Sequence, residues 1–368
     1  MSASWSEPVW ATTDHLIEGA SLSGILAHKL GPLAANRLRR LDQPLPKPLV
    51  GEERAASLAM LSAIPLLHRI RNGCEGPLLL LKGPEIGALY PRNGRRFGDI
   101  DILTPDAEEV QRSLLTRGFE LGEPDFDMSD GLHHHLPPIC WPTIPLNIEV
   151  HSSPNWPPRA QQPPLAEIIE AAVPSVLGVE GIGAPSRLHH TLIFAAHAWR
   201  HEPLFVLRDL VDVAVLSQGI EAGELDRLAS RWGIARLWAT TKGAVDALFY
   251  GGRRTMPLRS WARHLELVRE RTVLENHLQR WLHPFWELPP AAALGQTAHV
   301  LRTEVAPVEG EPWSRKVTRS VGALRNPSAP AKRPAVAPPA AAQTPAAGPQ
   351  DVEPAQDDDP ADREAGSR

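Results

Sequence analysis

Residues 78–103 read LLLLKGPEIGALYPRNGRRFGDIDIL, and the rest of the chain is interpreted outward from this stretch. A leucine run ends at Lys82-Gly83, and a second apolar run carries Asp99 and Asp101 two positions apart. Successive strand side chains point to opposite faces, so we expect both carboxylates on one face. Carboxylates beside a glycine turn suit a divalent cation carrying a nucleoside triphosphate, because Mg²⁺ prefers oxygen ligands and glycine lets the backbone approach phosphates. The alternative is a surface strand with two solvated acids.

The length and charge of the chain limit what it can bind. Its 368 residues suffice for about two domains with apolar cores. The net charge is −5, and residues 326–368 hold four Lys and Arg against seven Asp and Glu. The remaining residues are nearly neutral, which argues against bulk nucleic acid as a partner. Small molecules, peptides or proteins are the favoured partners.

Cysteine usage and hydropathy predict a cytoplasmic location. Cys74 and Cys140 lie far apart and outside any C-x-x-C motif, so neither a disulfide framework nor a cysteine zinc site is indicated. The N-terminus lacks a basic start followed by an apolar core, and no apolar run approaches the roughly 18 residues that span a bilayer. We therefore expect a soluble protein of a reducing cytoplasm, without a membrane partner.

Two further segments accompany the opening stretch. Apolar residues recur at helical spacing over 52–71, which predicts a helix that packs on the sheet through Leu58, Leu61, Ile64 and Leu67, with a kink or break at Pro65. A second helix is expected over 108–117, where Asp106 is an N-cap and Gly118 a stop signal.

Strict alternation marks another strand at 146–151, LNIEVH. Its apolar residues are expected to face the core, while Glu149 and His151 share the polar face. If this strand lies beside the Asp99 strand, Glu149 becomes a third carboxylate of the same site. The preceding His133, His134 and His135 are read either as a solvated loop or as a lining of the cleft.

The second half of the chain carries helical patterns. Residues 188–199 and 206–216 each repeat apolar side chains at helical spacing, and Trp199, Trp232 and Trp238 fall at apolar positions that predict a core role. Beyond Pro289 the helical signal fades. From Pro327 onward, alanine, proline and acidic residues predict a disordered tail, because large apolar side chains are nearly missing.

The combined motifs resemble a known family. The Lys-Gly turn, Arg95, the Gly-Asp-Ile-Asp-Ile-Leu run, the Ile-Glu-Val-His strand and LIFAAHAWRHEPLFVLRDLVDVAVL are similar to the uncharacterised bacterial nucleotidyltransferase family of the polymerase-beta-like superfamily. The resemblance covers about residues 52–250. Two departures stand out, because Lys82-Gly83 replaces the Gly-Ser or Gly-Gly pair of the superfamily and Arg96 stands where many relatives carry proline.

The resemblance implies an α+β protein in four parts. A small mixed-sheet nucleotidyltransferase domain with flanking helices is expected over 52–160, preceded by a helical segment and linker over 1–51. An all-helical domain is expected over 161–300, and a largely disordered Ala/Pro/acidic tail over 301–368.

The implied reaction transfers a nucleoside monophosphate from an NTP to a hydroxyl or similar acceptor, with Mg²⁺ or Mn²⁺. Catalytic metal ligands would be Asp99, Asp101 and Glu149, in a two-metal site with ions about 3.5–4 Å apart. The residues implied to bind the nucleotide are Lys82, Gly83, Arg95, His151, His197, Arg208 and Asp209. The acceptor stays open among a small molecule, a peptide and a protein, and a tRNA end is also possible.

Two other interpretations remain beside the enzyme. The altered Gly-Ser turn keeps open a protein of the same fold that binds nucleotide or a partner without turnover. His197 and His201 share a helix face at a spacing that can bind zinc, which would suit a hydrolase. Ala198 replaces the glutamate of H-E-x-x-H, however, so we expect hydrogen bonds to Asp209 or Asp212, or nucleotide contacts. Arg208 and Asp209 are read equally as a salt bridge between helices.

Overall fold

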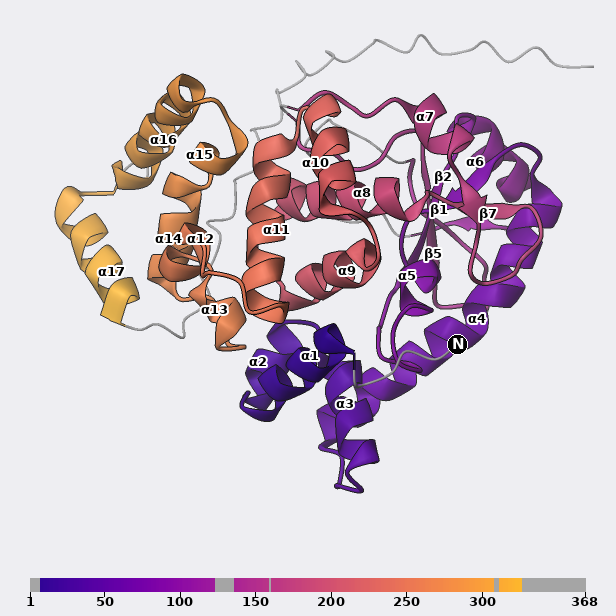
Figure 1. Ribbon diagram of the computed structural model, residues 1–368, viewed down its shortest axis with the longest axis horizontal. Helices are drawn as coiled ribbons and strands as arrows, with labels where there is room; N and C mark the ends of the chain where they lie inside the picture. Colours follow the sequence, from indigo (N-terminus) through magenta and orange to yellow (C-terminus); the bar gives the residue numbers. More distant parts are fainter. Residues whose placement is uncertain (1–6, 123–135, 159, 308–310, 326–368) are drawn as a thin grey trace, which may run out of the picture. The chain divides into compact units, whose positions relative to one another are not determined.

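The computed structural model describes residues 7–122, 136–158, 160–307 and 311–325. Within these residues the expected α+β class is confirmed, with a mixed sheet of seven strands accompanied by helices (Figure 1). The described residues fall in one compact unit, Met1–Ala329. The histidines His133, His134 and His135 and the tail beyond 325 lie outside the described residues.

The sheet runs in the order β3-β4-β5-β2-β1-β7-β6. The strands are β1 (Leu78–Leu80), β2 (Asp99–Leu103), β3 (Glu120–Leu121), β4 (Ile139–Cys140), β5 (Asn147–His151), β6 (Val173–Pro174) and β7 (Ile182–Ala184). The helices of the first half are α1 (Pro8–Glu18), α2 (Leu22–Ala27), α3 (Gly31–Arg40), α4 (Lys47–Gly73), α5 (Pro84–Gly87), α6 (Ala107–Thr116) and α7 (Leu165–Glu170). The later helices are α8 (Arg187–His201), α9 (Leu207–Ser217), α10 (Ala222–Arg231), α11 (Ala235–Phe249), α12 (Met256–Ser260), α13 (Arg263–Glu266), α14 (Val273–Leu282), α15 (Pro284–Glu287), α16 (Pro290–Val305) and α17 (Trp313–Arg325).

The strand that carries Glu149 lies beside the strand that carries the aspartates, as expected. β5 pairs with β2 in parallel, and Asp101 is opposite Glu149 in the register. β1 pairs with β2 on its other side, antiparallel. A short connection suffices for that antiparallel pair, whereas the parallel pair needs the long crossover that contains α6.

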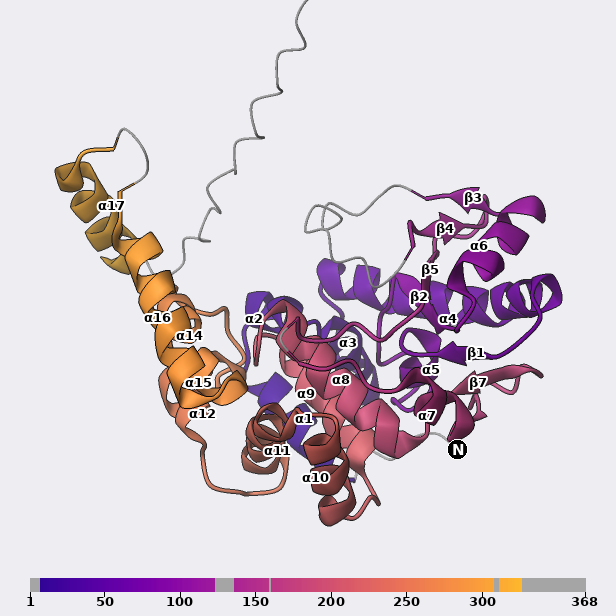
Figure 2. The ribbon, with the colours of Figure 1, turned by 90° about the horizontal axis from the view of Figure 1, so that it is seen from above.

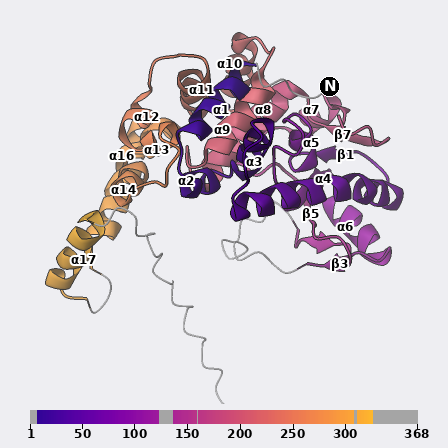
Figure 3. The same ribbon diagram turned by 90° about the horizontal axis from the view of Figure 1, so that it is seen from below.

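The two faces of the central strands pack against different helices. Leu80, Ile102 and Val150 on one face join the apolar core under α4 and α6. Leu79 and Leu103 on the opposite face join the larger core of the helical half. Figure 1 shows α4 and α6 on one side of these strands and α8 and α9 on the other, and Figures 2 and 3 show the same arrangement from above and below. The carboxylates therefore lie on the face that the helical half covers.

The structure corrects the predicted buried face of α4. Leu67 is buried as predicted, but Leu58, Leu61 and Ile64 are exposed, and the core beside the sheet instead contains Ala59, Ala63, Leu66 and Ile70. Alanines allow the helix to approach the sheet closely. The face that contains them is therefore buried, although the larger apolar side chains lie on another face. Pro65 does not break α4. It has no N–H for the carbonyl four residues earlier, but it lies on the exposed side of the helix, where water can bind that carbonyl.

The helical half contains the expected tryptophan core. Trp199, Trp232 and Trp238 are buried, as predicted. Helices α8, α9 and α11 contact one another, and α1 contacts both α9 and α11. The N-terminal helices are therefore part of the same packed core as the second half.

The chain beyond Pro289 is more helical than its sequence pattern indicated. Residues 290–305 form α16 and residues 313–325 form α17. Pro290 fits the first position of a helix, where its missing N–H has no intrahelical partner, and the alanines after it favour helix. No helix of the described residues has the length and apolarity that a membrane crossing requires.

Candidate active site

Four polar side chains gather on one face of the β2–β5 pair. Asp99 and Asp101 alternate with buried isoleucines on β2, and Glu149 and His151 alternate with Ile148 and Val150 on β5. Because the strands run parallel with Asp101 opposite Glu149, the two pairs occupy the same face. The periodicity of two residues thus places four titratable groups together.

Asp101 is the centre of this group. Its Oδ1 accepts a hydrogen bond from Lys82 Nζ at 3.0 Å and another from His151 Nε2 at 3.1 Å. The side chain of Asp101 is fully buried, and its Oδ2 has no hydrogen-bond partner among the described residues. A buried carboxylate oxygen without a donor is costly, so this oxygen is suited to a cation.

The charges of these three groups depend on one another. Burial opposes ionisation of Asp101, but the Lys82 ammonium and the His151 imidazole more than offset it and hold the pKa of Asp101 well below its usual range. Burial likewise opposes the charge of Lys82, and the carboxylates of Asp101 and Asp99 raise its pKa overall. His151 also has a raised pKa, because its hydrogen bonds to Asp101 and Glu149 outweigh burial.

Asp99 is the weaker acid of the pair. Burial, followed by the charge of Asp101, raises the pKa of Asp99 to about 6, while Lys82 acts in the opposite direction. Two carboxylates on one strand face resist simultaneous ionisation. A divalent cation would remove this conflict, because it stabilises both negative charges at once.

The residues that come together differ from the expected metal ligands by one member. Ligand atoms of Asp101, Glu149 and His151 all lie within 4.8 Å of one another. His151 Nε2 lies 3.5 Å from Glu149 Oε2. Hard oxygen ligands with a buried, partnerless oxygen at Asp101 fit Mg²⁺ or Mn²⁺. His151 was expected only as a nucleotide-binding residue, and its spacing from Glu149 was the signal that it belongs to this group.

Gly83 forms the turn that the sequence predicted next to the carboxylates. Its φ is +65°, in the left-handed region, and it precedes the four-residue helix α5. A Cβ atom at this position would lie 2.5 Å from the carbonyl oxygen of Asp99. Real Cβ atoms do not approach that closely, so only glycine lets the turn lie against the start of β2.

Arg95 lies in a buried ion pair with α9. Its Nε and Nη2 donate to the two carboxylate oxygens of Asp212, at 2.9 Å each, and Tyr90 donates its hydroxyl to the same carboxylate at 2.6 Å. Both Arg95 and Asp212 are nearly inaccessible to solvent. The resemblance implied that Arg95 binds the nucleotide, and in the structure its charge is compensated by Asp212.

The other candidates of the helical half lie near the start of α9 and on α8. Arg208 Nη2 is 3.5 Å from Asp209 Oδ1, so the predicted ion pair joins neighbours on one helix rather than two helices. His197 is half-buried on α8 and belongs to no metal-binding group of the described residues, which leave out the side chain of His201. The zinc interpretation therefore gains no support.

His190 is a residue that sequence reasoning missed. Its Nε2–H donates to the carbonyl of Leu81 at 2.5 Å, which joins α8 to the chain immediately before Lys82. The His189-His190 pair resembles any polar interruption of an amphipathic helix, so the sequence carried no signal for this bond.

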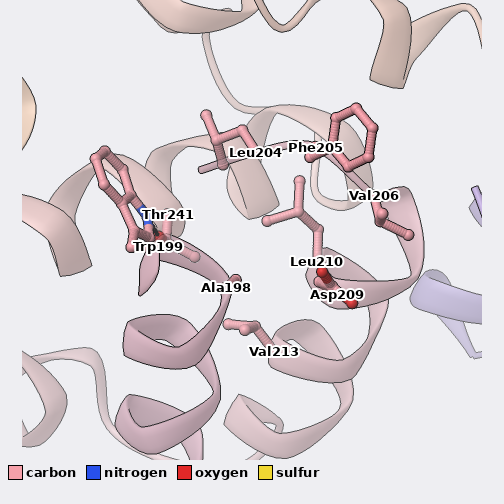
Figure 4. A pocket seen from close by; sticks show the side chains of 9 residues that line it. All are labelled: Ala198, Trp199, Leu204, Phe205, Val206, Asp209, Leu210, Val213 and Thr241. Carbon is pink, nitrogen blue, oxygen red and sulfur yellow. Dashed lines mark hydrogen bonds between the residues drawn. The ribbon is translucent and has the colours of Figure 1, made fainter. Parts of the chain in front are cut away.

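A small cavity lies between α8 and α9. It offers about 10 Å³, room for about one water molecule. Figure 4 shows apolar side chains around it and Asp209 as its carboxylate, and Trp199 donates to Thr241 beside it at 2.9 Å. A nucleotide cannot enter this space.

Comparison with known families agrees with this site. Residues 21–249 match the family described as uncharacterised nucleotidyltransferase. Neither a curated protein nor a solved structure matched the chain. The family match spans more than half of the 368 residues and includes every member of the carboxylate group. The chain belongs to the uncharacterised nucleotidyltransferase family.

Proposed function

We propose that the protein transfers a nucleoside monophosphate from an NTP to a hydroxyl acceptor on a small molecule, a peptide or a protein, with Mg²⁺ or Mn²⁺, as a polymerase-beta-like nucleotidyltransferase of the cytoplasm. The observation that carries the proposal is the buried Oδ2 of Asp101, which has no hydrogen-bond partner among the described residues and lies beside Glu149. An active nucleotidyltransferase needs a cation at such an oxygen, whereas a purely structural aspartate would have a donor there.

The carboxylates have separate roles in this proposal. Asp101 and Glu149 would hold the metal, and Asp99 would join them once its proton is lost. A bound divalent cation supplies Lewis-acid stabilisation of the phosphoryl oxygens. Glu149 accepts the proton of the acceptor hydroxyl, whose oxygen then bonds to the α-phosphorus while the bond to pyrophosphate breaks. The hydroxyl proton thus goes to Glu149, and pyrophosphate is the leaving group.

The cationic side chains keep the carboxylates ready for this step. Lys82 and His151 donate to Asp101 and favour its ionised form. Gly83 lets the backbone approach the phosphates. Arg95 has a positioning role, because its bonds to Asp212 join the chain before β2 to α9.

A second candidate function rests on the Lys82–Asp101 ion pair. The Lys82 ammonium lies 3.0 Å from Asp101 Oδ1 and so occupies a position where a metal ion could bind this oxygen. A protein that has lost metal binding could retain such a pair and bind nucleotide or a partner without turnover. Metal dependence separates the two candidates.

The test is calorimetric titration of the four NTPs with and without Mg²⁺. We expect one or more NTPs to bind only with Mg²⁺ and binding to be lost in Asp101→Asn and in Asp99→Asn. Asp246→Asn is the matched control, since this aspartate pairs with Lys242 on α11. Metal-independent binding would support the second candidate, and no binding by the wild type would contradict the enzyme. Transfer of label from an α-labelled NTP would then identify the acceptor.

A further inference from the structure

Helix α2 ends in a turn that normally requires glycine. The Lys29 N–H donates to the carbonyl of Leu26, and the Leu30 N–H donates to that of Ile25, both at 3.0 Å. This is a Schellman motif, and Lys29 occupies its left-handed position with a φ of +57°. A lysine there is strained compared with glycine, and strain of this kind collects at functional sites.

The position of Lys29 is fixed by its neighbours. The His28 ring accepts a hydrogen bond from the Leu207 N–H through Nδ1 at 3.2 Å and donates through Nε2 to the carbonyl of Arg269 at 2.9 Å. Gly24 lies so close to Val268 that a Cβ atom would be 1.9 Å from its carbonyl oxygen. The bond between His28 and Leu207 holds the end of α2 against the start of α9. Lys29 directly follows His28, and Arg208 directly follows Leu207.

The end of α2 and the start of α9 therefore bring two cationic residues, Lys29 and Arg208, near each other. The charge of Arg208 is the main cause that lowers the pKa of Lys29, while Asp209 and Asp99 act in the opposite direction. The ammonium of Lys29 forms no ion pair with a described carboxylate, and Arg208 Nε is a buried donor without a partner among the described residues. Lys29 itself is exposed. An exposed ammonium near a guanidinium whose Nε has no partner among the described residues is suited to bind an anion.

We propose that Lys29 and Arg208 bind the triphosphate of the nucleotide. This proposal rests on the proposed function and adds that the N-terminal helix α2 is part of the nucleotide site. A polyphosphate suits this proposal because its several phosphates could bind a metal at the carboxylates and these two cations together. Lys82 cannot fill this role alone, since its ammonium is engaged with Asp101. The family match begins at residue 21 and therefore includes α2.

The chain supplies a matched control for a test of Lys29. Asp42 follows α3 in an equivalent motif, with a φ of +52°, its N–H bonded to Arg39 and the Gln43 N–H bonded to Leu38. It is exposed, as Lys29 is. Both Lys29→Gly and Asp42→Gly place the preferred residue in a left-handed position, so neither should lower the melting temperature. Only Lys29→Gly removes a cation from the proposed site.

The affinities are measured by calorimetry with Mg²⁺-NTP and with inorganic tripolyphosphate. We expect Lys29→Gly to weaken both by about tenfold or more, Lys29→Arg to recover most of the loss, and Asp42→Gly to bind as the wild type does. Unchanged binding in Lys29→Gly overturns this assignment and leaves the proposed function standing. Tripolyphosphate binding that depends on Lys29, without any NTP binding, supports the anion site and contradicts the proposed function. Failure of the wild type to bind either ligand overturns both.

Discussion

Asp212 accepts hydrogen bonds from Arg95 through both of its carboxylate oxygens, although 117 residues separate the two in the chain. The pair is buried, and Tyr90 donates to the same carboxylate. It joins the connection between β1 and β2 to helix α9. This buried cluster therefore helps to align the helical half with the carboxylate face, together with the His190 bond to Leu81 and the shared apolar core.

Removal of the acid from this pair should be strongly destabilising. In Asp212→Ala the guanidinium of Arg95 is left buried without its partner, so we expect the free energy of unfolding to fall by about 3–5 kcal/mol. Asp246→Ala removes the carboxylate of a half-buried pair on α11 and should cost less than about 1 kcal/mol. Urea denaturation of both variants measures the difference. Similar losses in the two would show that the Arg95 pair contributes no more than a surface one.

Lys82 should compete with a divalent cation for Asp101. In Lys82→Met, Asp101 keeps only His151 as a charged partner, so without divalent ions we expect a loss of about 2–4 kcal/mol. Added Mn²⁺ should then raise the melting temperature of the variant more than that of the wild type, because the cation replaces the missing charge. Thermal denaturation with chelator or Mn²⁺ measures both. Lys242→Met serves as control, and an equal Mn²⁺ effect in all three proteins would contradict the competition.

The turn at Gly83 should tolerate no side chain. Gly83→Ala combines an unfavourable φ of +65° with a Cβ atom 2.5 Å from the Asp99 carbonyl, so the start of β2 must move. We expect a loss of about 2–3 kcal/mol and of Mg²⁺-NTP binding. Gly76→Ala has a similar φ, +79°, but meets nothing within 4 Å, and should cost about 1 kcal/mol without affecting binding. Equal effects of the two substitutions would exclude a special role for the contact with Asp99.

Acid should weaken the bond between α8 and the end of β1. Burial lowers the pKa of His190 from 6.5 to about 4, so the unfolded chain takes up this proton before the folded protein does. The contribution of neutral His190 is complete above pH 6.5 and is lost as the pH falls towards 4, by about 3 kcal/mol. Unfolding by urea between pH 7 and pH 4 should show this slope, and His190→Gln should flatten it. Parallel curves for the variant and the wild type would contradict the assignment.

Local sequence patterns predicted the central strands well. Alternation along residues 99–103 and 147–151 was sufficient to place Asp99, Asp101 and Glu149 on a strand face, because side-chain direction in a strand follows from the backbone alone. Lys82-Gly83 was also predicted correctly as a turn, because a backbone with positive φ is favourable mainly for glycine.

The same patterns failed where the choice of contact lay outside the segment. The largest apolar side chains of α4 suggested the wrong face, because packing on the sheet selected its alanines and left Leu61 exposed. The resemblance implied that Arg95 binds the nucleotide, and no local pattern indicated that its buried partner would be Asp212 on α9. Lys29 was missed altogether, since the weak helix of residues 22–27 carries no mark of its contact with Leu207.

The sequence by itself determined the α+β class, the carboxylate pair of Asp99 and Asp101, the glycine turn and membership in a nucleotidyltransferase family, because each is encoded by neighbours along the chain. Tertiary structure alone decided that Asp101 lies opposite Glu149 beside His151, that Arg95 pairs with Asp212, and that the end of α2 with Lys29 is held against the start of α9. Charge interactions depend on the distance between groups in space and on the exclusion of water, and neither can be derived from local sequence patterns.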